Sequence, residues 1–486
     1  MSLRSWLTGC LTPAGRGRGG RQRPLASIVG QILGSVARGR LSALPFAVAL
    51  WDGSELPAAT ATKGPVVTAS VRAVPYLLRQ PNELGLARAW VTGALDLDGD
   101  LEDVLVHRDR FASVSLSLCD RARVAAAGVR IMGPAVLLRA PVVDSEARII
   151  GRLHSVHRDR AAVGHHYELP AAFYRLLLGP TVVYSCAYFE RPDETLKRAQ
   201  RRKLEVICRK LQLRTGDRLL DIGCGWGSLV MHAAAEHGVR AVGVTASVEQ
   251  AIEASARIRQ AGLTGRCEVR AADYREVNDG PYDAIASVGM YEHVGRDQLT
   301  NYTAAVAALL RPGGAFLNHG IARLSPGPTH DRTFIRRFVF PDGDLHPVTD
   351  VLHALEAAGL EIRDVESLRE HYPLTLRHWA ANLDRSRERA VQLVGAERER
   401  IWRLYLIASA LAFEHGELSV FQVLTTRPGA RHRLPLSRGR TLARDRPPGL
   451  PARASTHQAQ PPSITAATGR ASDRPDRSPP ATRRSQ

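Results

Sequence analysis

The alternation of apolar and polar positions through the middle of the chain predicts a repeated strand and helix. Short apolar runs, each expected to form a buried strand, end near residues 222, 245, 274, 293 and 319. Amphipathic helical spacing separates several of these runs. This rhythm is typical of an α/β fold with a doubly wound, mostly parallel, Rossmann-like sheet covered by helices on both faces. Ligands of such folds bind at the carboxyl ends of the strands, where polar residues of this chain collect.

The sequence LLDIGCGWG, residues 219–227, is the most informative of these strand ends. Asp221 stands just before three alternating glycines, Gly223, Gly225 and Gly227, and an apolar helical run follows them. Glycine allows positive φ and lets a ligand approach the backbone, and a helix N-terminus favours an anionic group such as a carboxylate. Dinucleotide sites share this strand, turn and helix, but the GxGxG spacing and the preceding acid favour S-adenosylmethionine.

Composition divides the chain into five regions. We predict a disordered basic segment over residues 1–40, a small α+β domain over 41–140, a polar linker over 141–163, the α/β domain over 164–427 and a disordered Pro- and Arg-rich tail over 428–486. The small domain shows no residues with the spacing of a catalytic site. We therefore expect the chemistry to reside in the α/β domain.

The formal net charge of +18 resides almost entirely in the two ends of the chain. Residues 1–40 hold seven Arg and no acid, and residues 428–486 hold twelve Arg and three Asp, which leaves +2 for residues 41–427. The nearly neutral folded part gives no indication of specific nucleic-acid binding. The basic ends suit non-specific contact with anionic lipid or nucleic acid, although solvated disorder explains most of their length.

The cysteines and the hydropathy indicate where the protein works. The six cysteines include no CxxC pair and no metal-ligand spacing, which fits a reduced cytoplasmic protein without a metal. No apolar run reaches the ~20 residues that span a bilayer, and the N-terminus does not read as a signal peptide. We expect a cytoplasmic protein that works peripherally at the inner membrane surface if its substrate is a membrane lipid.

Residues 165–190 are unusually rich in aromatic side chains. Aromatic faces stabilise cations such as a methyl sulfonium by ~0.5–2 kcal/mol, whereas Phe173 and Phe189 are explained equally well as core residues. In the stretch that follows, apolar residues such as Ile207 and Cys208 recur at helical spacing. We therefore expect Cys208 to lie in the core.

Motifs spread over residues 165–427 resemble the cyclopropane-fatty-acyl-phospholipid synthase family, which includes the mycolic acid cyclopropane synthases. The matching stretches include HYELPAAFY, LGPTVVYSCAYFE, LLDIGCGWG, GVTASVEQ, SVGMYEHVG, RPGGAFLNHGI, FVFPDGDL, ESLREHYPLTLRHW and YLIASALAF. The resemblance implies a class I S-adenosylmethionine-dependent methyltransferase fold. It also implies transfer of a methylene group to the cis double bond of an unsaturated acyl chain. Residues 41–140 resemble, less strongly, the amino-terminal domain of the phospholipid-acting members.

The resemblance also implies a catalytic set. In the family a bound bicarbonate removes a proton from the transferred methyl, and its ligands correspond here to Cys186 (through its backbone), Glu292, His319 and Tyr372. These side chains can donate to an anion, the glutamate when it is protonated. Several family members have a wall cysteine where this chain has Ser409. That difference leaves methyl transfer intact and keeps a ring-free reaction open.

For S-adenosylmethionine, the resemblance implies binding residues at four strand ends. An acid that commonly ends the second strand is replaced here by Thr245, with Gln250 as the substitute, and Asp273 is expected to face the adenine amino group. The full predicted set is Tyr184, Ser185, Asp221, Gly223, Cys224, Gly225, Thr245, Gln250, Asp273 and Tyr274.

Three functions follow as hypotheses. The first is a cyclopropane synthase acting on unsaturated phospholipid acyl chains at the membrane surface. The second is a lipid C-methyltransferase that makes methyl- or methylene-branched chains, and the third is a lipid-binding protein with a degenerate enzyme domain. The cofactor motifs argue against the third. Self-association into a homodimer stays open.

Overall fold

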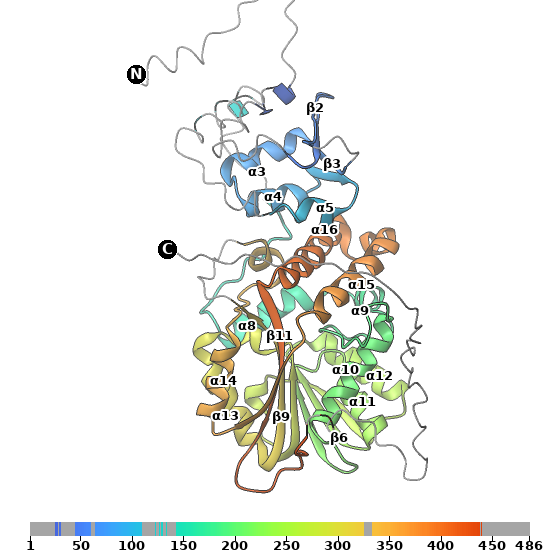
Figure 1. The fold of residues 1–486 in the computed structure, drawn as a ribbon, viewed down its shortest axis with the longest axis vertical. Helices are drawn as coiled ribbons and strands as arrows, with labels where there is room; N and C mark the ends of the chain where they lie inside the picture. Colours follow the sequence, from blue (N-terminus) through green and yellow to red (C-terminus); the bar gives the residue numbers. More distant parts are fainter. Residues whose placement is uncertain are drawn as a thin grey trace, which may run out of the picture. The chain divides into compact units, whose positions relative to one another are not determined.

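Seven strands form one sheet in the α/β part of the chain (Figure 1). The computed structural model describes residues 44–59, 64–108, 142–324 and 333–437, with isolated positions outside these ranges. Strand β11 runs antiparallel to its neighbours β9 and β10, and the remaining neighbours pair in parallel. The spatial order is β10 (Glu361–Ser367), β11 (Leu418–Thr426), β9 (Leu310–Arg323), β8 (Tyr282–Val288), β5 (Arg218–Ile222), β6 (Arg240–Thr245) and β7 (Cys267–Ala271).

The five strands predicted from the sequence are confirmed as β5 to β9. Strands β5 and β6 end at the predicted residues, Ile222 and Thr245. Strand β9 continues past the predicted end at His319, because it pairs with β11 as far as Arg323. Strands β7 and β8 end earlier than predicted, since short 3₁₀ turns replace extended backbone there. No strand after β9 is predicted from the sequence, and the structure shows two more, β10 and β11.

Helices cover both faces of the sheet, as predicted (Figure 1). One face carries α10 (Leu196–Lys210), α11 (Ser228–His237) and α12 (Val248–Gln260), and the other carries α13 (Leu299–Leu309) and α14 (Val348–Ala357). A separate apolar cluster lies between the sheet and each helical layer. Cys208 is fully buried in the first of these clusters, which confirms its predicted place in the core.

Four further helices form a third apolar cluster that is rich in aromatic side chains. They are α8 (Val156–Tyr167), α9 (Ala171–Leu178), α15 (His371–Arg385) and α16 (Arg387–Glu414). Helix α16 is kinked at Gly395, whose φ of 82° only glycine adopts readily. Phe173 and Phe189 are buried in this cluster, which confirms that both are core residues.

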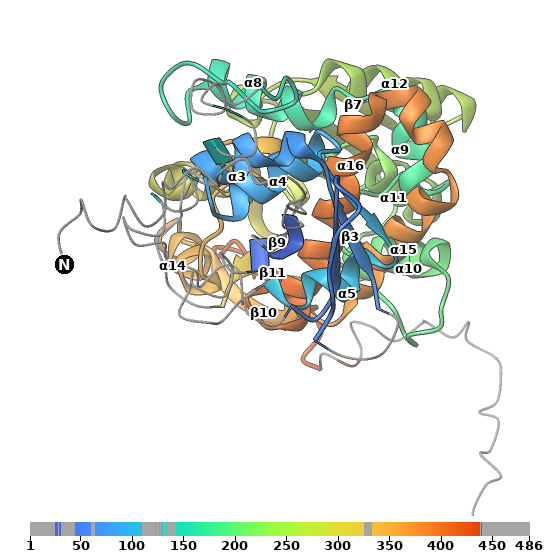
Figure 2. The ribbon, with the colours of Figure 1, turned by 90° about the horizontal axis from the view of Figure 1, so that it is seen from above.

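A small sheet precedes the α/β part and shares this aromatic cluster. It has the strand order β2 (Glu55–Leu56), β1 (Ala47–Leu50), β3 (Val66–Ala69), β4 (Leu95–Asp98), with helices α3 (Val74–Arg79), α4 (Glu83–Val91) and α5 (Leu101–Leu105). Figures 1 and 2 both show α4 and α5 beside α16. The Trp90 indole N–H donates to the Arg400 carbonyl oxygen at 3.0 Å, and the Arg377 guanidinium pairs with Glu102.

The predicted linker and tail differ from the structure at their edges. Helix α8 begins at Val156, inside the predicted linker of 141–163, because Ser155 caps it by accepting from the Arg158 N–H. After residue 427, Arg433 pairs with Asp217 at 2.6 Å and Leu434 packs on the core. Most of the predicted disordered ends lie outside the described residues. Among the described helices, none has the length and apolarity needed to cross a membrane.

Candidate active site

The glycine turn has the backbone that the sequence predicts. Gly223, Gly225 and Gly227 have φ values of 78°, 54° and 75°, and Gly227 caps α11, which begins at the predicted Ser228. The N–H groups of Gly223 and Cys224 both donate to the Val244 carbonyl oxygen, at 2.9 and 3.0 Å, which ties the turn to β6. A Cβ added at Gly225 would meet no atom within 4 Å. The turn therefore leaves open space directly over its backbone.

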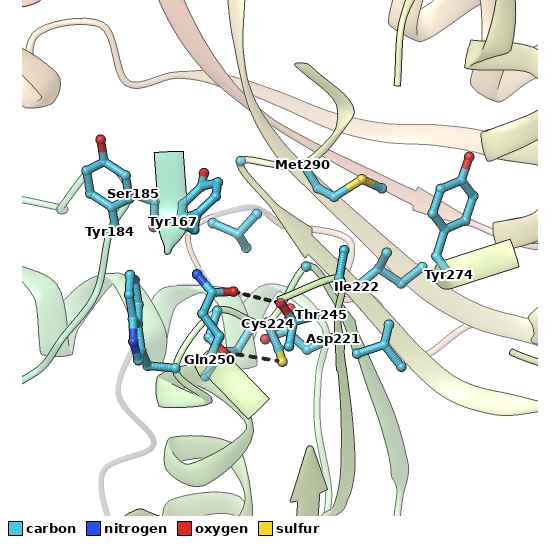
Figure 3. A pocket seen from close by; sticks show the side chains of 18 of the residues that line it. Tyr167, Tyr184, Ser185, Asp221, Ile222, Cys224, Thr245, Gln250, Tyr274 and Met290 are labelled. Atoms are coloured by element: carbon cyan, nitrogen blue, oxygen red, sulfur yellow. Dashed lines mark hydrogen bonds between the residues drawn. The ribbon is translucent and has the colours of Figure 1, made fainter. Parts of the chain in front are cut away.

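This open space belongs to a cavity of about 170 Å³ at the carboxyl ends of the parallel strands. Figure 3 shows Tyr167 and Tyr184 on one side of it and Tyr274 on the opposite side. Every predicted cofactor residue lines this one cavity: Tyr184, Ser185, Asp221, Gly223, Cys224, Gly225, Thr245, Gln250, Asp273 and Tyr274. The structure thus brings together side chains from the ends of β5, β6 and β7 and from the segment after α9.

Polar side chains at the ends of β6 and β7 are held in place by local hydrogen bonds. The Thr245 hydroxyl donates to Gln250 Oε1 at 2.6 Å, so the Gln250 amide is fixed with its nitrogen free to donate (Figure 3). Asp273 accepts from the Arg275 guanidinium at 2.7 and 2.6 Å, and these bonds lower the pKa of Asp273 despite its burial. Asp273 is therefore an anion whose oxygens already have a partner.

Lys203 lines the cavity and was missed by the sequence analysis. Its ammonium is buried and donates to the Ser185 hydroxyl at 2.9 Å. Burial raises the pKa of Asp221 to about 7 and lowers the pKa of Lys203 to about 8, and the charge of each partly offsets the effect on the other. Asp221 Oδ1 is buried without a hydrogen-bond partner among the described residues. The sequence did contain a sign that Lys203 is buried. Lys203 stands four residues before Ile207, so it lies on the same helix face, which was predicted to be buried.

Two residues of the predicted catalytic set carry buried polar atoms that lack partners. Glu292 Oε1 accepts from the Ile321 N–H at 2.8 Å, whereas Glu292 Oε2 has no partner among the described residues. His319 Nδ1 accepts from the Gln422 amide at 3.2 Å, and His319 Nε2 is likewise without a partner there. Burial raises the pKa of Glu292 to about 7 and lowers the pKa of His319 well below its usual value. The imidazole is therefore neutral, with its proton on Nε2.

Glu292 and His319 border the cofactor cavity without lining it. Glu292 lies between Met290 and His293, which both line the cavity. The carbonyl oxygen of His319 accepts from the N–H of Gly289, another lining residue, at 2.8 Å. The two partnerless atoms thus belong to residues directly adjacent to the cavity wall.

The remaining predicted catalytic residues are placed unequally. Cys186 is fully buried and directly follows the lining residue Ser185. Tyr372 is also buried, and burial raises the pKa of its phenol well above its usual value, with smaller electrostatic contributions from neighbouring groups, of which Tyr405 is the first. Ser409 is half-buried on α16, and no hydrogen bond among the described residues joins it to the others. The structure therefore does not connect Ser409 with the set.

An aromatic wall stands behind Tyr184. The ring of Tyr184 lies 5.2 Å from Trp379 and 5.6 Å from Trp402, and its hydroxyl donates to Tyr405 Oη at 3.2 Å. His166 Nε2 is 3.0 Å from the same Tyr184 hydroxyl, and burial keeps this histidine neutral by lowering its pKa well below its usual value. The cavity is thus bounded on this side by electron-rich faces, which attract cations.

Comparison with known proteins identifies the family. The family model of the mycolic acid cyclopropane synthetases matches residues 154–423. The chain belongs to this family. With the seven-stranded sheet and its cavity, it is a class I S-adenosylmethionine-dependent methyltransferase that modifies lipids, which confirms the predicted family and fold class.

Three similar proteins show the range of this family. A probable fatty acid methyltransferase of Pseudomonas putida is 38% identical over 406 residues, 81% of this chain and 95% of its own. The cyclopropane-fatty-acyl-phospholipid synthase of Escherichia coli K12 is 36% identical over 54% of this chain and 66% of its own. The solved structure of the mycolic acid cyclopropane synthase CmaA1 with SAH and CTAB is 34% identical, with a TM-score of 0.53, over 55% of this chain and 98% of that chain.

Proposed function

We propose that the enzyme transfers a methylene group from S-adenosylmethionine to the cis double bond of an unsaturated phospholipid acyl chain, forming a cyclopropane ring. The observation that carries this proposal is that Glu292 Oε2 and His319 Nε2, two buried polar atoms without partners among the described residues, belong to residues that adjoin lining residues of the cofactor cavity. A relative named as a cyclopropane-fatty-acyl-phospholipid synthase supports the same reaction.

The cavity fits S-adenosylmethionine in shape and charge. Open space over Gly225 admits a ligand against the backbone, and the ammonium of Lys203 suits a carboxylate. When bound, the cofactor supplies the methyl group, and loss of one proton from that methyl after transfer closes the ring. Tyr184 and the aromatic wall behind it suit the positive charge of the sulfonium and of the alkylated acyl chain.

Each of the two partnerless atoms could donate to a small oxyanion such as bicarbonate, which would accept that proton. His319 donates through Nε2–H, and Glu292 donates through Oε2 when its carboxyl is protonated, as a pKa of about 7 allows. Tyr372 and the backbone of Cys186, both buried, complete the proposed ligand set, as the family resemblance implies. Ser409 has no role in this proposal.

A second candidate is methyl transfer without ring closure. The Pseudomonas putida relative matches 81% of this chain, including residues before the family model begins, and it is named a probable fatty acid methyltransferase. The two products can have equal mass, because both gain one CH₂. The cyclopropane product has no double bond at the modified site, whereas a methylene-branched product keeps one.

The test is product analysis of the full chain with S-adenosylmethionine and vesicles of a cis-monounsaturated phosphatidylglycerol. Proton NMR of the extracted lipid distinguishes the shielded protons of a cyclopropane from the vinyl protons of a methylene branch. We expect cyclopropane signals that grow with added bicarbonate. New terminal =CH₂ or branch-methyl signals, distinct from the CH=CH protons of unreacted substrate, would select the second candidate. Product from free fatty acid but none from phospholipid would change the substrate class.

A further inference from the structure

Helices α10 and α11 bring three metal-ligand side chains together at a place away from the cofactor cavity, and Glu205 contacts two of them. Glu205 and Cys208 lie one turn apart on α10, whereas His232 lies near the middle of α11 and His237 is its last residue. A ligand atom of Cys208, one of His232 and one of His237 all lie within 4.8 Å of one another. Glu205 Oε2 is 3.1 Å from the Nε2 atoms of both His232 and His237. We propose that this group binds one divalent transition-metal ion of the zinc class.

The distances fit a tetrahedral ion. Bonds of about 2.0–2.3 Å to nitrogen, oxygen and sulfur separate neighbouring ligand atoms by about 3.3–3.6 Å. The two separations between Glu205 and the histidine nitrogens are already close to this value. The ligand atom of Cys208 lies within 4.8 Å of those of the two histidines. One thiolate, two imidazoles and one carboxylate form a donor set that suits zinc and cobalt and disfavours magnesium or calcium.

The surroundings prepare each ligand. Arg209 donates to Glu205 Oε1 at 2.6 Å, which orients the carboxylate and leaves Oε2 directed at the histidines. The side chains of Glu205 and His237 are 28% and 17% exposed, so an ion can enter from solvent, whereas Cys208 closes the inner side. With a divalent cation the charges of Glu205 and the Cys208 thiolate are balanced.

Binding changes protons in a defined way. In the described structure both histidine Nε2 atoms face the same carboxylate oxygen, so both carry hydrogen. Coordination requires each proton to move to Nδ1 and the Cys208 S–H bond to break, with one proton released to solvent. Because binding releases this proton, affinity should rise with pH. No redox change accompanies the step.

The predicted consequence is stability. The ion would join the middle and the C-terminal end of α11 to α10, while the first turn of α11 adjoins the glycine turn of the cofactor cavity. None of the four ligands lines that cavity. We therefore expect the ion to raise the unfolding temperature without altering S-adenosylmethionine affinity, which separates this inference from the proposed reaction.

The experiment uses tag-free full-length protein, stripped with a chelator and titrated with Co²⁺ and then Zn²⁺. We expect one ion per chain, the intense visible bands of tetrahedral cobalt, and a thiolate-to-cobalt charge-transfer band. Saturating zinc, at ~100 times its Kd, should raise the unfolding midpoint by roughly 5 °C. The proposal would be overturned if cobalt-treated wild-type protein showed none of these bands. Glu205 and the two histidines would then form only a hydrogen-bonded network.

Variants test the ligands individually. Cys208→Ser should lose the charge-transfer band, and His237→Gln should weaken zinc binding by ~100-fold or more, while both retain S-adenosylmethionine binding. Cys267→Ser is the matched control, because Cys267 is a second buried cysteine in the same core cluster and lies outside the group. If Cys208→Ser does not fold, the half-buried position of His237 keeps the second variant usable. Unchanged zinc affinity in His237→Gln would contradict the site.

Discussion

The two sides of the cofactor cavity are built in different ways. On one side the glycine turn and the ends of β6 and β7 present backbone and short polar side chains from neighbouring strands. On the other side Tyr184 is backed by Trp402 and Tyr405, more than 200 residues later in the chain. The first side depends on backbone conformation, and the second on aromatic packing between distant helices. Because of this difference, mutations are expected to affect the two sides unequally, and the two sides could be predicted from the sequence to different extents.

The largest effect is expected on the backbone side. Gly225→Val should weaken S-adenosylmethionine binding by ~100-fold or more, because a φ of 54° strains a β-branched residue and the side chain fills the open cavity. Isothermal titration with the cofactor measures this. Gly359→Val is the matched control, since its φ of 77° is also positive and its added Cβ meets nothing within 4 Å. Equal affinity in wild type and Gly225→Val would refute the cofactor assignment.

The second effect separates binding from chemistry. Glu292→Gln should keep near-normal cofactor affinity, because Glu292 does not line the cavity, but lose turnover by ~10²-fold or more. Initial rates against bicarbonate concentration, together with cofactor titration, measure both quantities. Glu356→Gln, at an exposed position of α14, serves as the control. Full activity of Glu292→Gln in bicarbonate-free buffer would favour the ring-free reaction.

The same residue predicts a pH dependence of stability. Burial raises the pKa of Glu292 from 4.5 to about 7, so the native state holds this proton more tightly than the unfolded state. Its favourable contribution is complete below pH 4.5 and is lost as the pH rises through 7. Between pH 5 and pH 8, wild type should therefore lose about 2.5 kcal/mol more unfolding free energy than Glu292→Gln. Urea unfolding of wild type and Glu292→Gln at both pH values tests this. An equal change in unfolding free energy with pH in the two proteins would contradict the burial argument.

The sequence disclosed the backbone side almost completely. Spacing alone located the strand ends at Ile222 and Thr245 and the start of α11, because glycine positions and apolar periodicity are local signals. The ten cofactor residues came from family resemblance placed on that frame, and one cavity contains them all. Lys203 escaped notice because a lysine on a helix is ordinarily solvated, and only the fold shows it beside Asp221.

The aromatic side was less predictable. The segment 165–190 indicated an aromatic cluster, but its partners on α15 and α16 depend on packing between elements far apart in the chain. Strands β10 and β11 were not predicted for a related reason. They add to the sheet edge through antiparallel pairing, and no glycine motif in the sequence marks such strands. Ser409 was placed near the site by resemblance, and the structure shows no hydrogen bond that links it there among the described residues.

A smaller effect is expected at the junction of the two sides. Lys203→Met should weaken S-adenosylmethionine binding by ~10-fold or more, because it removes a buried ammonium suited to the cofactor carboxylate. Methionine retains the length and apolar stem of the side chain. Lys197→Met, on the exposed face of the same helix, is the control. Titration with the cofactor and with its decarboxylated form distinguishes a contact between Lys203 and the cofactor carboxylate from a purely structural role of Lys203, such as its hydrogen bond to Ser185. An equal loss for both ligands would indicate damage to the fold rather than loss of a carboxylate contact.

The smallest effect is expected on the aromatic side, at Ser409. Ser409→Cys should change turnover by less than ~3-fold, because the side chain is half-buried and the substitution alters only one atom. The proposed reaction forms no bond to a thiol, so a cysteine at this position adds no chemistry. The measurement is the ratio of ring to branched product by NMR, together with the initial rate, in wild type and variant. A tenfold change in rate, or a switch in product, would show that position 409 touches the acyl chain and that the aromatic side extends further along α16 than its hydrogen bonds indicate.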